Sequence, residues 1–189
     1  TGDDAVPGDA LIGLPSSGVH SNGYTLARRA LLADGGLRLD DTPPELGGST
    51  VGETLIEPTA IYVRGVLALL DSDVPVHGLA HITGDGVLNL LRLAAPVGYR
   101  IEEPLRPPPV FELLARLGGV EAPEMWEVFN MGCGFVAVVP EDRAQDAVAL
   151  LGERHPGVAR IGTVTDEAGR VALPGLGLDG DRRGLRASP

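Results

Sequence analysis

The sequence contains no lysine and a single cysteine, and each absence excludes a kind of chemistry. All 15 basic residues are arginines, so the chain offers no lysine for a phosphate-binding loop or a Schiff base. Cys133 has no second cysteine with which to form an intrachain disulfide or a thiolate metal site. A nucleotide, if one is bound, must be held by other groups.

Positive charge and long apolar runs are also scarce. The formal net charge of −11 disfavours binding to nucleic acid or to an anionic membrane surface. No apolar run approaches the roughly 18 residues of a membrane span, and the acidic stretch TGDDAVPGD is unlike a signal peptide. We therefore expect a cytoplasmic protein whose partners are small molecules or other proteins, with no nucleic acid and no membrane.

Short strands and helices follow one another without a regular βαβ period, which predicts an α+β fold with a mixed, mainly antiparallel sheet covered by helices. Thr50 and Glu53 have the spacing of a helix-starting capping box, and the apolar positions of 63–70 have helical spacing. One domain is expected over 1–175, and the glycine- and arginine-rich stretch 176–189 is predicted to be a flexible tail. Strands are predicted at 9–14, 99–103, 135–139, 159–164 and 170–173, and helices at 22–34, 63–70, 87–95, 110–117, 123–129 and 141–153.

The stretch GLPSSGVHSNGY, residues 13–24, holds more small hydrogen-bonding residues than a turn needs. His20 within it could act as a general acid or base, or could orient a ligand. An ordinary strand–turn–helix connection, with Ser21 or Asn22 as N-cap, explains the same pattern. The residues alone leave both interpretations open. Five positions would let a phosphate approach the backbone at a helix N-terminus: Ser16, Ser17, Gly18, Ser21 and Asn22.

Other reactive side chains give weaker signals. His77 and His81 are four residues apart, but Gly78 between them and the lack of an adjacent glutamate argue against a helical metal pair. Cys133 lies in a glycine turn, where a small buried thiol is the expected role. The sequence therefore predicts no metal site.

Four segments, in order and spacing, resemble the C-terminal half of the aminoimidazole ribonucleotide (AIR) synthetases, also called phosphoribosylformylglycinamidine cyclo-ligases. The similarity runs from residue 8 to about residue 164. It implies a three-layer α/β/α arrangement. The segments are GDALIGLPSSGVHSNGYTLARRAL (8–31), EPTAIYVRGVLALL (57–70), HGLAHITGDG (77–86) and FNMGCGFVAVVP (129–140).

The resemblance implies an ATP-dependent ligase of purine biosynthesis. In that family, ATP phosphorylates the formyl amide oxygen of formylglycinamidine ribonucleotide, a nitrogen attacks, phosphate leaves, and the imidazole of 5-aminoimidazole ribonucleotide closes. ATP and Mg²⁺ are bound mainly by an N-terminal domain that we expect to be absent from these 189 residues. The isolated chain is therefore expected to be inactive. Family members are homodimers with active sites between the two domain types.

The same resemblance assigns residues to the site. His20 and His81 are expected to be catalytic. The other residues are expected to line the substrate site in three segments: Ser16, Ser17, Gly18, Ser21 and Asn22; Thr83, Gly84 and Gly86; and Asn130 and Gly132.

Two positions depart from the family pattern. Asp85 stands where the family usually has the second of three glycines after the threonine, and Ala60 stands where it has an arginine. Both changes make the surroundings of a bound phosphate less positive. Two alternatives therefore remain: a related ATP-dependent enzyme of the same superfamily, such as formylglycinamidine synthase, selenophosphate synthetase, thiamine-phosphate kinase or the hydrogenase maturation dehydratase, and a standalone ligand-binding or dimer-interaction module.

Overall fold

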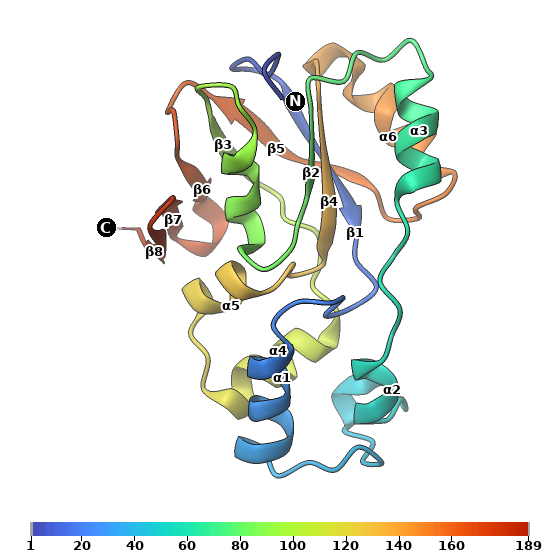
Figure 1. Cartoon of the computed structure of the whole chain (residues 1–189), viewed down its shortest axis with the longest axis vertical. Coiled ribbons are helices and arrows are strands. Elements are labelled where there is room, and N and C mark those ends of the chain that lie inside the picture. Colours follow the sequence, from blue (N-terminus) through green and yellow to red (C-terminus); the bar gives the residue numbers. More distant parts are fainter. Residues whose placement is uncertain (1, 189) are drawn as a thin grey trace.

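The computed structural model, which describes residues 2–188, contains an eight-stranded sheet that occupies the upper part of the protein as drawn in Figure 1. The strand order is β2-β4-β1-β5-β3-β6-β7-β8. Neighbouring strands are antiparallel except for β3 and β6, which are parallel. The strands are β1 (Ala10–Pro15), β2 (Gly78–His81), β3 (Gly98–Ile101), β4 (Cys133–Val139), β5 (Ala159–Thr165), β6 (Val171–Leu173), β7 (Leu178–Asp181) and β8 (Gly184–Ala187).

Helices lie on both faces of this sheet. The α-helices are α1 (Tyr24–Arg28), α2 (Val51–Leu55), α3 (Val63–Leu70), α4 (Pro109–Gly118), α5 (Ala122–Val128) and α6 (Ala144–Gly152). A π-helical turn, η1 (Arg29–Asp34), continues α1. The 3₁₀ helices are η2 (Pro44–Leu46), η3 (Gly86–Arg92), η4 (Glu141–Arg143) and η5 (Pro174–Leu176).

The alternation of side chains along β1 and β4 creates two cores. Ala10 and Ile12 of β1 pack on one face, in the core shared with α3 and α6, whereas Leu11 packs on the other face, in the core to which η3 belongs. Val138 and Val139 of β4 divide in the same way. Successive residues of a strand point to opposite faces, so a strand buried on both sides is apolar throughout. The mainly antiparallel α+β fold and its three layers are confirmed.

The capping box forms, and the helix that it begins, α2, is only five residues long. The Oγ1 atom of Thr50 accepts a hydrogen bond from the Glu53 amide at 3.0 Å, and Glu53 accepts one from the Thr50 amide at 2.8 Å. The helix ends at Leu55, because Pro58 disfavours a helical conformation in the residue before it. The helix at 63–70 is a separate element.

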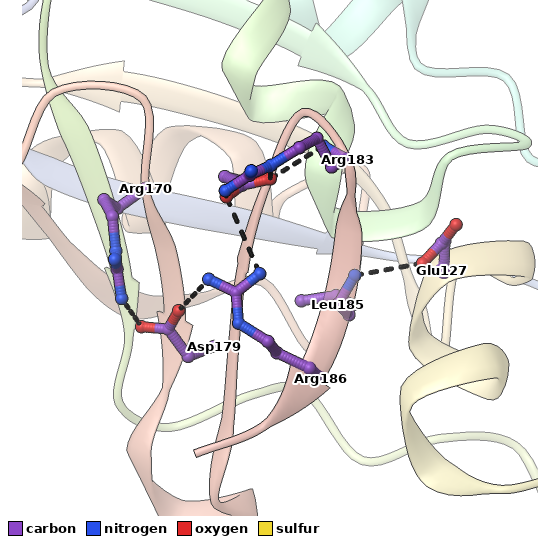
Figure 2. A network of polar contacts seen from close by, with 7 residues as sticks. Glu127, Arg170, Asp179, Arg183, Leu185 and Arg186 are labelled. Atoms are coloured by element: carbon purple, nitrogen blue, oxygen red, sulfur yellow. Dashed lines mark hydrogen bonds and ion pairs between the residues drawn. The ribbon is translucent and has the colours of Figure 1, made fainter. Parts of the chain in front are cut away.

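The C-terminal segment differs from the flexible tail predicted from residue 176. Residues 178–187 form a hairpin, β7 and β8, that extends the sheet beside β6. Leu178 is buried, and the side chains of Asp179 and Arg170 form an ion pair between the hairpin and the loop before β6 (Figure 2). Backbone pairing and ion pairs therefore order a segment that has little apolar content.

Within residues 2–188, none of the helices has the length and apolar character needed to cross a membrane.

Candidate functional site

Three strands bring the three small-residue segments to one edge of the sheet. β4 is antiparallel to both β1 and β2, and Pro15 pairs with Cys133 while His81 pairs with Phe135. The end of β1, the end of β2 and the start of β4 therefore lie together. We name the adjoining segments the first corner (16–22), the second corner (82–86) and the third corner (130–132).

Asn130 fastens the third corner to the first. Its Oδ1 atom accepts hydrogen bonds from Ser16 Oγ at 2.7 Å and from the Gly132 amide at 2.9 Å. Its Nδ2 atom donates to the Gly18 carbonyl at 2.8 Å. The side chain is only 3% exposed, so water cannot replace these bonds. Asn130 therefore holds the shape of the site and is not exposed to a ligand.

Asn89, which the sequence analysis missed, holds the second corner. Its Oδ1 atom accepts hydrogen bonds from both the amide and the hydroxyl of Thr83. The signal was a lone asparagine inside the apolar run VLNLLRL, where a buried amide needs partners.

Lack of space explains one of the two glycines of the second corner. Gly86 has a φ of +52°, and a Cβ atom there would lie 1.9 Å from the Trp126 carbonyl oxygen. A Cβ atom on Gly84 would lie 3.7 Å from Asn22 Oδ1, which places the second corner beside the first. Gly86 thus allows η3 to pack on α5, and Gly84 faces the first corner.

His20 is buried and has a left-handed backbone, with φ of 58°. Its Nε2 atom accepts hydrogen bonds from the Ser17 amide at 3.1 Å and the Ala60 amide at 3.4 Å. Burial, with a smaller contribution from His81, lowers the pKa of His20 to about 4. His20 is therefore neutral near pH 7, with its proton assigned to Nδ1, since Nε2 is an acceptor.

The segment 57–60 forms a wall beside the first corner. Ser17 Oγ donates to the Pro58 carbonyl at 2.6 Å, and the hydroxyls of Ser21 and Thr59 lie 3.0 Å apart. Ala60 takes part only through its backbone amide, which faces His20. The segment therefore meets the first corner through main-chain groups and short side chains.

Tyr62 lies between the two histidines. Its ring centroid is 6.3 Å from that of His20 and 6.2 Å from that of His81, and its hydroxyl donates to the Pro15 carbonyl at 2.8 Å. Burial raises the pKa of the Tyr62 phenol well above its ordinary value. A Cβ atom on Gly134 would lie 2.0 Å from the Tyr62 hydroxyl oxygen, so glycine is needed there. Tyr62 and Gly134 were not identified from the sequence.

The grooves around the corners differ in charge. Ser17 and Gly18 line a groove of about 230 Å³ together with Glu53 and Glu57, and no arginine lines this groove. Asp85 lines another, of about 490 Å³, where its carboxylate pairs with Arg92. The negative charge of Asp85 is thus largely compensated by a guanidinium. In the described part of the chain, no group of three or more His, Cys, Asp or Glu residues is placed to hold a metal ion.

Solved structures with this fold belong to chains longer than this one, since the match covers 27% to 55% of their length. A crystal structure of the hydrogenase maturation protein HypE matches the whole chain and 55% of its own length, with a TM-score of 0.57 and 22% identity. The thiamine monophosphate kinase of Aquifex aeolicus has a TM-score of 0.52 and 19% identity over 92% of this chain and 52% of its own. T. maritima PurL complexed with FGAR has a TM-score of 0.52 and 14% identity over 97% of this chain and 27% of its own. At these identities the likeness defines the fold alone.

Residues 6–173 match the family of AIR synthase related proteins, C-terminal domain, and the chain belongs to this family. The phosphoribosylformylglycinamidine cyclo-ligase of Methanothermobacter thermautotrophicus is 48% identical over 174 residues, which cover 92% of this chain and 50% of that protein. The cyclo-ligase of Myxococcus xanthus is 49% identical over 172 residues, 89% of this chain and 49% of that protein. The chain spans about half the length of these curated relatives, and the resemblance noted in the sequence is confirmed.

Proposed function

We propose that this chain is the substrate-side domain of a phosphoribosylformylglycinamidine cyclo-ligase. The whole enzyme would use ATP to close formylglycinamidine ribonucleotide to 5-aminoimidazole ribonucleotide in the cytoplasm. The observation that carries the proposal is the junction of the first and third corners through Asn130, in a chain 48% identical to a cyclo-ligase over 92% of its length. Ring closure needs an oriented substrate more than a protein nucleophile, and the only cysteine is buried, with its pKa raised to about 12 by that burial.

The two histidines would have different roles. His20 is buried and its Nε2 atom already accepts two backbone hydrogen bonds, so we assign it as a positioning residue that joins the first corner to segment 57–60. His81 is exposed at the end of β2, where it could exchange a proton with a bound ligand, and we assign it as the catalytic histidine.

The remaining site residues would orient the ribonucleotide. Ser17 and Gly18 line the groove of about 230 Å³, and Ser21, Asn22, Thr83 and Gly84 continue this surface toward the second corner. Ser16, Gly86, Asn130 and Gly132 would support it from behind, since their contacts are with other parts of the chain.

ATP and Mg²⁺ do not fit this chain's residues as their only ligands. The groove beside Ser17 carries two carboxylates, and the described residues hold no cluster suited to a metal ion. We therefore assign ATP and Mg²⁺ to an N-terminal half, from which ATP would supply the phosphoryl group that activates the amide oxygen. This chain's residues would hold the ribonucleotide and exclude water.

An exposed apolar strip supports the existence of such a second half. It comprises Ile56, Ile61, Val63, Leu67 and Leu70, whose exposed fractions run from 49% to 77%. Val63, Leu67 and Leu70 have the i, i+4, i+7 spacing of one helix face, and exposed apolar faces of this kind mark protein interfaces. The strip flanks segment 57–60, which contacts the first corner. Because the relatives are about twice as long as this chain, we propose that their N-terminal half covers the strip. We further propose that the whole enzyme is a homodimer.

A chimera tests the proposal directly. This chain replaces the C-terminal half of the Methanothermobacter thermautotrophicus relative, and formation of ADP and 5-aminoimidazole ribonucleotide is measured. We expect turnover by the chimera and none by the chain alone. His81→Ala should lower kcat by 10²-fold or more, whereas Arg64→Ala, a change at an exposed residue of α3, should have little effect. A folded chimera without turnover, or a chain that is active alone, would contradict the proposal.

A further inference from the structure

A groove of about 490 Å³ lies between η3, α5 and the β7–β8 turn. Asp85 and Arg92 of η3 line it, together with Glu127 of α5 and the two turn residues, Arg182 and Arg183. Three guanidinium groups therefore border one groove of a chain whose net charge is −11. The turn also lies beyond residue 173, where the family match ends.

Most of the charges in the groove are already engaged. Asp85 pairs with Arg92, and Arg183 Nη2 lies 2.8 Å from Asp181 Oδ2. Glu127 accepts a hydrogen bond from the Leu185 amide at 3.0 Å (Figure 2). The acidic side chains are thus neutralised or hydrogen-bonded within the protein.

Arg182 differs from its neighbours. Its Nη2 atom donates to the Leu91 carbonyl at 3.2 Å, which fixes the guanidinium at the rim of the groove. Among residues 2–188 it has no carboxylate within 4.0 Å, so its other N–H donors are available to a ligand. A guanidinium presents a planar fork that matches phosphate oxygens.

From this arrangement we propose that the groove binds a phosphate monoester, with Arg182 as the principal contact. Arg92 and Arg183 complete a positive wall, and Leu88 and Leu91 offer apolar surface to the carbon part of the ligand. The volume suits a sugar phosphate better than a bare ion. Two sources share this chemistry: a sugar phosphate without a base, and a nucleoside 5′-monophosphate.

The other groove near the corners is a poorer phosphate site. Glu53 and Glu57 line it without an arginine, and carboxylates repel a phosphate dianion. Asp85 links the arginine groove to the second corner, where Gly84 faces Asn22. A phosphate bound beside Arg182 would therefore lie next to the second corner, in a groove that Ser17 does not line.

The proposal can be tested without any catalytic assay. The 189-residue chain is titrated with ribose 5-phosphate at low salt, and binding is measured by isothermal titration calorimetry. Ribose, which lacks the phosphate, is the ligand control, and adenosine 5′-monophosphate is the second arm. We expect ribose 5-phosphate to bind and ribose not to bind. Arg182→Ala should weaken binding about tenfold or more, because it removes charge-assisted hydrogen bonds. Added salt should weaken binding as well.

Two further variants sharpen the result. Arg64→Ala removes an exposed arginine from α3, away from the groove, and should leave the affinity unchanged. Asp85→Asn should tighten binding several-fold, because it releases Arg92 from its ion pair. Three results would overturn the proposal. They are equal affinities for ribose and ribose 5-phosphate, no binding of either phosphate probe, and an unchanged affinity for ribose 5-phosphate in Arg182→Ala. Stronger binding of the nucleotide would support it and identify the nucleotide as the source.

Discussion

Asn130→Ala is expected to destabilise the protein by about 3 kcal/mol, because it removes three hydrogen bonds at once. Each such bond contributes about 1 kcal/mol to stability. The side chain is 3% exposed, so the amide of Gly132 and the carbonyl of Gly18 would lose a partner that water cannot easily replace. For a protein of this size the loss corresponds to a fall of about 6 to 12 °C in Tm.

Urea unfolding followed by circular dichroism measures this loss. Asn22→Ala is the matched control, since Asn22 belongs to the same site but makes no side-chain hydrogen bond to the residues of 2–188. It should change the free energy of unfolding by less than about 0.5 kcal/mol. Asn130→Asp keeps the acceptor atom but loses the donor to Gly18, so it should also destabilise. Equal unfolding free energies for Asn130→Ala and Asn22→Ala would refute the reasoning.

Two further predictions concern the surroundings of His20. Gly134→Ala should destabilise by about 1 to 3 kcal/mol through overpacking, because its Cβ atom would lie 2.0 Å from Tyr62 Oη and 2.7 Å from His20 Cε1. Gly152→Ala in α6, where nothing lies within 4 Å, should instead be neutral or stabilising, and equal effects in urea would contradict this. The pKa of His20 falls from 6.5 to about 4 on folding, so the unfolded chain binds more protons in that range and stability falls as the pH falls through it. The full effect is about 3 kcal/mol; His20→Gln should flatten this dependence, and an unchanged slope would show that His20 is not its source.

Local elements could be predicted because their causes lie within a few residues. The capping box of Thr50 and Glu53 and the helical spacing of 63–70 both depend on neighbours along the chain. The meeting of the three corners depends on the antiparallel pairing of β4 with β1 and β2, which no local pattern encodes. The family resemblance, and not the spacing of the residues, suggested that these segments belong together.

The parts that sequence reasoning missed are held by contacts between different elements. Asn89 and Tyr62 are polar groups whose partners lie in loops or on another element. The hairpin 178–187 resembles a frayed tail in composition, but it is ordered by pairing with β6 and by ion pairs such as that of Arg170 and Asp179. Arg183 holds the pKa of the Asp181 carboxyl well below its usual range.

The distance along the chain between the first and third corners also affects biosynthesis. Ser16 and Asn130 are 114 residues apart. At 5 to 20 residues per second, the ribosome would need about 6 to 23 s to make the intervening chain. During that time β1, with its apolar sequence ALIGLP, has neither of its partner strands, β4 and β5. Nascent chains of this protein therefore expose an apolar segment for several seconds, and a chaperone that binds exposed apolar segments has that time in which to act.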